Sequence, residues 1–357
     1  MNVAQASHLN AFLPVDPAGT PPPPGGSVEI APGVRWLRMS LPVELNHINL
    51  WALDDGAGWT IIDSGIDHPD ARSAWERLLR DDLGGRPVTR VIATHLHPDH
   101  AGLAGWLVER FDCRLWMARS EYLMAKAYAA STGEEPAFRD LFFRAGWQPH
   151  EIDALATRRR TVAGFYSPLP GSYRRLRDGD SLQIGGRRWS IIAGGGHSPE
   201  HLCLHCPELG LFISGDKVLP TISSNISVDP TEPDGDPLSE WFVTLARIRA
   251  AVPADVLVLP SHGGCFTGLH RRIDTLVAEQ RLALIRLRAE LAVPKRADEV
   301  FGTLFSRPIP RNNMPLMGLA TGESLAMLNH LIATGDVVRS EGADGAWRYH
   351  SEGTASP

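Results

Sequence analysis

Cysteine is scarce in this sequence. The chain of 357 residues has four, at positions 113, 203, 206 and 265. They are too few and too scattered for the disulfide framework of a small secreted protein, so a reducing compartment is expected. Cys203 and Cys206 form a CxxC pair, but a single pair beside alternating apolar residues is weak evidence for a redox or metal site.

Long apolar runs are also missing. No stretch of about 18 apolar residues is present to cross a bilayer. The N-terminus lacks a basic segment followed by an apolar one, which is the pattern of a secretory signal. We therefore expect a cytoplasmic protein without a membrane partner.

The sequence has no excess of positive charge. Its 35 Lys and Arg residues are outnumbered by 41 Asp and Glu residues, and the formal net charge is −6. Nucleic acid would have to be held by a local basic patch, because the overall field does not attract phosphates. The Arg-rich segment 158–160 is short and is typical of a solvated surface, so the sequence argues against a nucleic-acid partner.

The remaining composition is that of a soluble globular protein, with 43% hydrophobic and 21% charged residues. Residues 1–27 include four consecutive prolines at 21–24, which cannot form a helix. This segment is predicted to be a flexible N-terminal arm or an arm that clasps a second copy of the chain. A homodimer is thus allowed.

Short apolar segments separated by turn residues predict an α/β catalytic domain over residues 28–293. Strands are expected at 34–37, 48–53, 59–62, 88–93, 182–184, 189–193, 202–205, 211–214 and 256–259. Helices are expected at 71–79, at 237–251 and after His270. Two sheets packed face to face with helices outside, an αββα sandwich, fit this order better than a doubly wound sheet.

Two further segments differ from this pattern. Residues 120–161 are predicted to form a helical insertion, and its bulky residues, such as Phe138 and Trp147, indicate either a lid over an active site or simple packing. Residues 294–357, with helices at 297–305 and 322–334 and a terminal hairpin, have the pattern of a small winged-helix-like domain. The helix at 322–334 contains no Lys or Arg, which favours a structural or oligomerisation role over DNA binding.

The richest cluster of chemical groups is Thr94-His95-Leu96-His97-Pro98-Asp99-His100, directly after an apolar strand. Imidazoles and carboxylates in one loop suit zinc, and also manganese or iron. A lone histidine is usually a satisfied core residue, but this spacing places several ligands in one turn. Three later candidates, His197, Asp216 and His262, also follow apolar strands, and their neighbouring glycines permit sharp turns.

The sequence contains, in this order, the HxHxDH loop at 95–100, a GH at 196–197, a GD at 215–216 and a PxHG at 260–263. These motifs resemble the metallo-β-lactamase superfamily over about residues 28–290, and the IDSG at 62–65 matches a further element of that family. The resemblance implies a first divalent ion on His95, His97 and His197, and a second on Asp99, His100 and His262. It implies that Asp216 bridges the two ions and that Asp63 orients a ligand or the loop. The pattern is closest to the glyoxalase II, lactonase and ribonuclease Z branches.

The resemblance also implies a mechanism. Two cations, with zinc favoured, would lower the pKa of a shared water so that a metal-bound hydroxide attacks an ester, thioester or lactone carbonyl of a small organic substrate. Asp99 would orient this nucleophile and carry its proton to the leaving group. Asp99 and Asp216 are therefore the expected catalytic carboxylates.

Three alternatives remain open at this point. An endoribonuclease or phosphodiesterase of the same fold is the first, because the C-terminal segment resembles the appendage of such an enzyme. A hydrolytic dehalogenase and a non-catalytic binding protein are more remote. The last is disfavoured because every matching ligand position is filled.

Overall fold

The computed structural model describes residues 21–42 and 45–351. The predicted N-terminal arm therefore falls largely outside the described residues. Residues 21–26 form no helix, as the prolines require. The first strand begins at Ser27.

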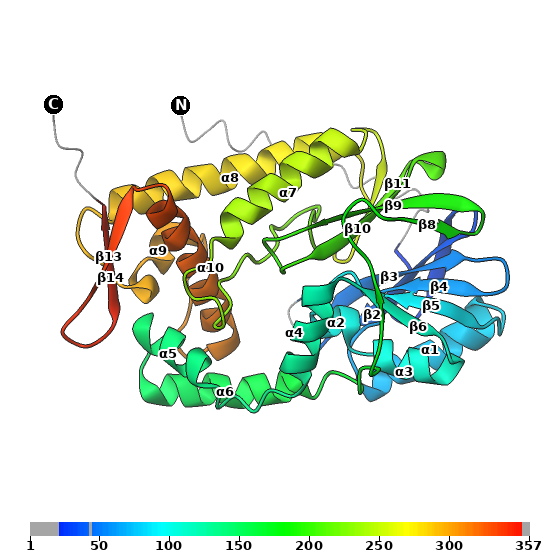
Figure 1. Cartoon of the computed structure of the whole chain (residues 1–357), viewed down its shortest axis with the longest axis horizontal. Coiled ribbons are helices and arrows are strands. Elements are labelled where there is room, and N and C mark those ends of the chain that lie inside the picture. The colour runs from blue at the N-terminus through cyan, green and yellow to red at the C-terminus, as the bar shows by residue number, and fades with distance from the viewer. Residues whose placement is uncertain (1–20, 43–44, 352–357) are drawn as a thin grey trace.

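Two sheets form the centre of the molecule (Figure 1). The first has seven strands in chain order: β1 (Ser27–Ala31), β2 (Val34–Ser40), β3 (His47–Asp54), β4 (Trp59–Ile62), β5 (Val88–Ile92), β6 (Arg114–Met117) and β7 (Arg174–Arg175). The second has five, in the order β12 (Leu257–Pro260), β11 (Leu211–Gly215), β10 (His201–Cys206), β9 (Arg187–Gly194) and β8 (Ser181–Ile184). The edge strand β7 of the first sheet and its neighbour β6 are not predicted from the sequence, since they are short and partly polar.

Side-chain alternation along the strands builds the layers. On β3, Ile48, Leu50 and Ala52 belong to the core beneath the helices, whereas Trp51 and Leu53 belong to the core between the sheets. The helices α1 (Pro69–Arg77) and α3 (Ala104–Phe111) cover the first sheet, and α7 (Pro237–Ala251) and α8 (Leu269–Glu290) cover the second (Figure 1). The expected αββα sandwich is therefore confirmed.

The insertion is helical, as predicted. It comprises α4 (Arg119–Ala129), α5 (Pro136–Arg144) and α6 (Pro149–Ala163). Both α5 and α6 begin with proline, whose fixed φ and missing N–H suit the first position of a helix. A π-helical turn, η2 (Leu78–Asp82), extends α1, and α2 (Pro98–Ala101) lies within the histidine loop.

The C-terminal segment differs in detail from the sequence prediction. The helix expected at 297–305 is split at Val300 into a 3-10 turn, η4 (Ala297–Glu299), and α9 (Phe301–Leu304). The helix expected at 322–334 begins earlier, as α10 (Met314–Ala333), because Pro315 occupies its first turn. The hairpin of β13 (Val337–Glu341) and β14 (Trp347–Ser351) follows.

One hydrophobic core joins the insertion, the second helical layer and the C-terminal segment. It contains Trp147 of the insertion, Trp241 of α7, Leu287 of α8, Leu328 of α10 and Tyr349 of β14, all almost fully buried. The helix α10 is therefore a packed core element.

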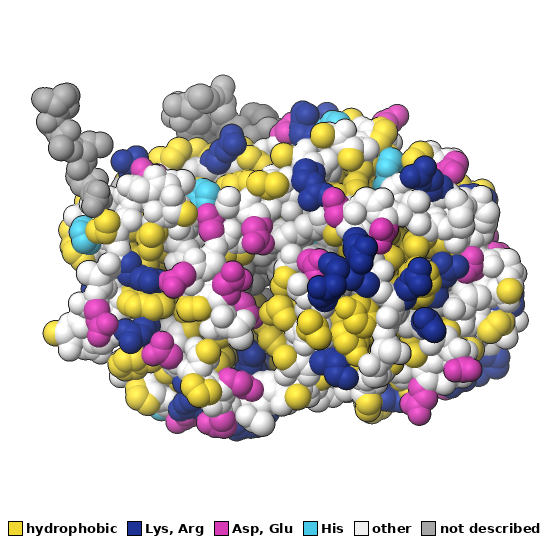
Figure 2. All heavy atoms as spheres, in the orientation of Figure 1, with side chains coloured by type: hydrophobic (Ala, Val, Ile, Leu, Met, Phe, Trp, Pro, Cys, Tyr) yellow, Lys and Arg dark blue, Asp and Glu magenta, His cyan; other side chains and the backbone are white. Residues whose placement is uncertain are grey.

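The described part of the chain contains no helix with the length and apolarity needed to span a bilayer. On the face seen in Figure 2, acidic and basic side chains lie interspersed over the C-terminal part at the left, and basic side chains gather near the middle.

Candidate metal centre

Four loops, each at the end of a strand, bring the candidate ligands together. The loop after β5 carries His95 to His100, and the loops after β9, β11 and β12 carry His197, Asp216 and His262. Gly196 has φ 117°, and a Cβ there would lie 2.4 Å from Cβ of Trp241. Only glycine fits this close approach, which sets the direction of the His197 loop.

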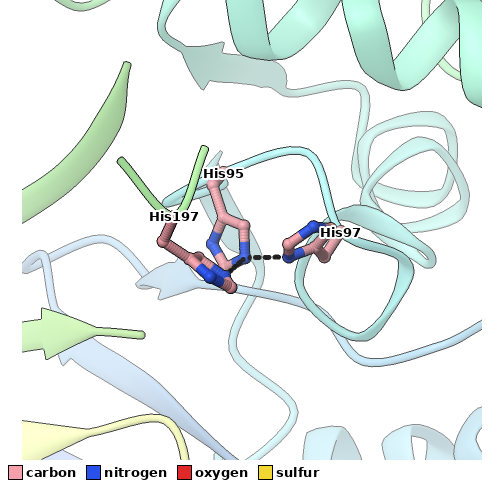
Figure 3. Close-up of side chains that lie close together, drawn as sticks. All are labelled: His95, His97 and His197. Atoms are coloured by element: carbon pink, nitrogen blue, oxygen red, sulfur yellow. Dashed lines mark hydrogen bonds between the residues drawn. The ribbon is translucent and has the colours of Figure 1, made fainter. Parts of the chain in front are cut away.

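The first group consists of His95, His97 and His197, whose rings converge in Figure 3. Nε2 of His95 lies 2.8 Å from Nδ1 of His97 and 3.2 Å from Nε2 of His197. Three imidazole nitrogens facing one point are the donor set of a zinc site.

The second group consists of Asp99, His100 and His262. Oδ2 of Asp99 lies 3.4 Å from Nε2 of His262 and 3.6 Å from Nε2 of His100. These donors are nitrogen and oxygen atoms, which suit zinc, manganese and iron alike.

Asp216 lies between the two groups. Its Oδ2 is 3.5 Å from Nε2 of His197 and 3.5 Å from Nε2 of His100, and its Oδ1 is 3.4 Å from Nε2 of His262. One carboxylate thus contacts both sides of the cluster. All predicted ligand positions converge on one site.

These residues fit a divalent cation. Nε2 of His100, Nε2 of His262 and Oδ1 of Asp216 are buried without a hydrogen-bond partner among the described residues. Buried polar atoms without a partner are costly, and each of these is a ligating atom aimed into the cluster. A cation in the cluster would satisfy them.

The neutral state of the histidines in the first group favours metal binding. Burial lowers the pKa of His95 and His97, and it lowers the pKa of His197 to about 3. These rings are therefore neutral at pH 7, which is the form that ligates a metal.

In the second group, the carboxylates and imidazoles act on one another. Burial raises the pKa of Asp99, but His100 and His262 outweigh it and lower the pKa to about 2. Burial lowers the pKa of His262, but Asp216 and Asp99 outweigh it and raise the pKa to about 10. The ionised carboxylates thus concentrate negative charge where a cation would bind.

Asp63 lies behind the cluster and is almost fully buried. Its carboxylate accepts hydrogen bonds from the backbone N–H of Thr94 at 2.7 Å and from the Thr94 hydroxyl at 2.8 Å, and it lies 2.7 Å from Nδ1 of His100. The backbone of Asp63 has φ 61°, an uncommon conformation for a residue with a side chain. The contact with Nδ1 directs Nε2 of His100 toward the cluster.

Backbone carbonyls orient two further imidazoles. Nδ1 of His197 donates to the carbonyl of Asn225 at 2.7 Å, and Nδ1 of His262 donates to the carbonyl of His47 at 2.9 Å. Each contact leaves Nε2 facing the cluster. The His47 ring stays outside the cluster and accepts a hydrogen bond from the N–H of Gly263 at 2.9 Å.

Glu121 is a buried carboxylate for which the sequence gives no signal. Its Oε2 accepts from the N–H of Leu96 at 2.8 Å, and its Oε1 accepts from the Ser198 hydroxyl at 2.6 Å and from the N–H of Glu200 at 2.7 Å. Leu96 lies between two ligands and Ser198 follows a third. Glu121 therefore ties together the two loops that supply the first group.

Two other buried side chains support the cluster. His201 accepts from the N–H of Asp216 at 3.1 Å, and its ring stacks on that of His95. Lys217 donates to the carbonyls of Gly194 at 3.0 Å and Gly195 at 2.8 Å, which hold the turn before His197. The sequence favours packing or a supporting contact for His201, and it gives no signal for Lys217.

Comparison with known families gives two matches along the chain. The family model described as "Metallo-beta-lactamase superfamily" matches residues 43–262. A second, described as "Metallo-beta-lactamase-like, C-terminal domain", matches residues 284–352.

Individual proteins agree with these matches. The crystal structure of a beta-lactamase domain protein from Burkholderia ambifaria has a TM-score of 0.86 and 42% identity, covering 94% of this chain and 97% of that one. The acyl-coenzyme A thioesterase MBLAC2 of Gallus gallus is 27% identical, over 66% of this chain and 79% of its own. The hydroxyacylglutathione hydrolase of Erythrobacter litoralis is 24% identical, over 69% and 78% respectively.

Proposed function

The chain belongs to the metallo-beta-lactamase superfamily and is a metallo-hydrolase of that fold, and from this premise we propose that it uses two divalent ions to cleave an ester, thioester or lactone. The observation that carries the proposal is the position of Asp216, within 3.5 Å of His100 and His197 and 3.4 Å of His262. A carboxylate shared by two ligand groups suits two ions better than one.

His95, His97 and His197 would hold the first ion, and Asp99, His100 and His262 the second, with Asp216 shared. Divalent cations, zinc in the first place, would supply Lewis acidity that lowers the pKa of water and polarises the substrate carbonyl.

The protein's own groups then have distinct tasks. Asp216 holds the two ligand groups at a fixed separation. Asp99 is ionised, because its pKa is about 2, so it can accept a hydrogen bond from the attacking water and pass a proton to the leaving oxygen or sulfur. In the overall reaction, water adds to the acyl carbon and the bond to the leaving group breaks. The products are a carboxylic acid and an alcohol or thiol.

The names of two relatives support an acyl substrate. The thioesterase and the hydroxyacylglutathione hydrolase both act on thioesters by name. Phosphodiester cleavage is the alternative class, and it has less support because α10, the longest helix of the C-terminal segment, carries no Lys or Arg to contact phosphate.

Metal analysis and a substrate panel test the proposal. We expect about two ions per chain and cleavage of a thioester, lactone or aryl ester that stops on chelation and returns with added zinc. In Asp216→Ala, the metal content should fall to one ion or fewer. The rate of hydrolysis should fall by more than the roughly 10–100-fold that is typical when a residue in contact with a metal ligand, rather than a ligand itself, is replaced.

The exposed Asp255 provides the matched control, because Asp255→Ala removes the same charge away from the site. Two bound ions and full hydrolysis in Asp216→Ala would contradict the dinuclear proposal. Cleavage of a phosphodiester alone would contradict the acyl substrate.

A further inference from the structure

A cavity of about 580 Å³ opens beside the candidate metal centre, and His97 is part of its wall. This volume is within the range of small-molecule sites. The other walls come from the helical insertion, the segment around Asn225 and the helix α10. The helices α6 and α10 lie side by side there (Figure 1).

The lining of the cavity is mainly apolar. Its apolar side chains from the insertion and from α10 include Phe138, Leu141, Phe142, Leu155, Leu316 and Leu319. Leu319 is 52% exposed although it lies on a helix whose other side is packed in the core. Apolar area left in contact with water beside a reactive centre is area that an apolar ligand can cover.

Two arginines of α6 also line the cavity, and they differ in their partners. Arg159 donates to the Ser131 hydroxyl at 2.9 Å and stacks over the rings of Tyr128 and Phe138. Arg158 is half-buried and has no ion-pair partner in the part of the chain that the structure describes. A cation without a counter-charge at the wall of an apolar cavity favours an anionic group on the ligand.

We propose that this cavity binds the apolar acyl chain of the substrate and that Arg158 contacts a negatively charged group of the same molecule. The inference rests on the proposed function only in placing the scissile carbonyl at the His97 end of the cavity. It also gives the C-terminal segment a role, because α10 supplies one wall. The anionic group is a phosphate on the leaving group or a carboxylate at the far end of the acyl chain.

Binding that needs no turnover tests the cavity. Titration calorimetry with butanoate, octanoate and dodecanoate should show affinity rising by about fourfold for each added methylene. Leu319→Asp should weaken dodecanoate binding by at least about tenfold, because a charge then faces the chain. Leu319→Trp, which narrows the cavity, should shift the preference toward shorter chains.

Leu282→Asp is the matched control. The exposed fraction of Leu282, 54%, is close to the 52% of Leu319, but Leu282 lies on α8 outside the cavity. Its variant should bind all three acids as the parent chain does. Affinity that does not depend on chain length, or equal effects of the two aspartates, would overturn the cavity assignment.

Three thioesters test Arg158 and locate the anion. They are dodecanoyl-coenzyme A, the N-acetylcysteamine thioester of dodecanoate, and the mono-N-acetylcysteamine thioester of dodecanedioate. Arg158→Ala should raise KM by about tenfold for one anionic substrate relative to the neutral one, because a hydrogen bond to a charged group is lost. The affected substrate identifies the anion as phosphate or carboxylate. An equal change for all three would overturn the role of Arg158.

The cavity and the proposed function can fail separately. Chain-length-dependent binding without any hydrolysis would support the cavity and contradict the hydrolytic proposal. Hydrolysis that is indifferent to chain length and to Leu319→Asp would support the hydrolase and contradict the cavity.

Discussion

Glu121 sets the relative position of the two loops that supply His95, His97 and His197, so its effect on metal binding can be predicted. In Glu121→Gln, the amide oxygen can keep the bonds from Ser198 and Glu200, but the amide NH2 then faces the N–H of Leu96. Because the amide NH2 and the N–H of Leu96 are both donors, this hydrogen bond is lost and the histidine loop is no longer held there. We expect metal affinity to fall by about 10–100-fold, measured by competition with a chromophoric chelator.

The exposed Glu109 supplies the control, since Glu109→Gln removes the same charge away from the loops. Unchanged metal affinity in Glu121→Gln, at unchanged thermal stability, would show that the two loops hold their positions without this carboxylate.

The same residue predicts a pH dependence of stability. Burial raises the pKa of Glu121 from 4.5 to about 7, although Ser198, the N–H groups of Glu200 and Leu96, and Lys217 oppose it. A raised pKa in the folded state means that the stabilising contribution is present below pH 4.5 and is lost as the pH rises through about 7. The free energy of unfolding of the parent chain, relative to Glu121→Gln, should therefore decrease between these values.

Urea unfolding of both chains with chelator, at intervals from pH 4.5 to 8, measures this difference. Chelation keeps proton competition with metal out of the comparison. A difference that stays constant or grows with pH would contradict a buried carboxyl with a raised pKa.

At the scale of residues, the sequence predicts the candidate metal ligands but not the groups that position them, and the reasons are physical. The ligand candidates were predictable because a histidine or an aspartate directly after an apolar strand must lie at a sheet edge. Glu121 was not predictable, because a glutamate in the first turn of a helix is usually explained by the helix dipole. The carbonyls of Asn225 and His47 are backbone groups, which every residue has, so the residue type does not predict their role.

At the scale of elements, α10 is linked to the candidate metal centre through the segment that begins at Asn225. The N–H of Val228 donates to the carbonyl of Gly322 at 3.2 Å, and the Ser227 hydroxyl donates to Oδ1 of Asn225 at 2.6 Å. The carbonyl of Asn225 in turn accepts from His197. A displacement of this segment should therefore reach a predicted metal ligand.

Gly322→Ala tests this link. A Cβ at this position would lie 2.5 Å from Oγ and 2.7 Å from Cβ of Ser227, so the segment must move. We expect a loss of about 1–3 kcal/mol in the free energy of unfolding, together with weaker metal binding. Thermal denaturation and chelator competition measure the two effects.

Gly302→Ala is the control, because a Cβ there meets no atom within 4 Å. A loss of stability in Gly322→Ala with unchanged metal affinity would show that α10 packs against the segment without positioning His197.

The sequence predicts the existence of the C-terminal helices but not their limits. The pattern of prolines from 308 to 315 reads as a turn, yet Pro315 lies in the first turn of α10, where the side chain of Asn313 caps the N–H of Leu316. A proline near a helix start is ambiguous in the absence of tertiary contacts. The domain limits 28–293 and 294–357 remain predictions.

At the scale of the molecule, the shared core predicts cooperative unfolding. Trp147, Trp241 and Leu328, from the insertion, α7 and α10, belong to one hydrophobic cluster. Removing any of these parts would expose the others, so they should unfold together. Calorimetry of the metal-free chain should show a single transition with no separate C-terminal one.

Metal removal should then lower the temperature of that whole transition. Because the candidate ligands come from loops after β5, β9, β11 and β12, cations would bind only the assembled fold. An ion present at 100 times its Kd stabilises by about 2.7 kcal/mol. An unfolding entropy of about 2.1 cal/mol/K per residue gives a chain of 357 residues about 1.3 °C in Tm per kcal/mol, so the expected shift is roughly 3–4 °C. Calorimetry with and without chelator measures the shift, and added zinc should reverse it. Asp216→Ala, which lacks the proposed shared ligand, should show a smaller shift than the parent chain. An equal shift in both chains would place the stabilising ion on the three histidines of the first group alone and would contradict the proposed sharing of Asp216 between two ions.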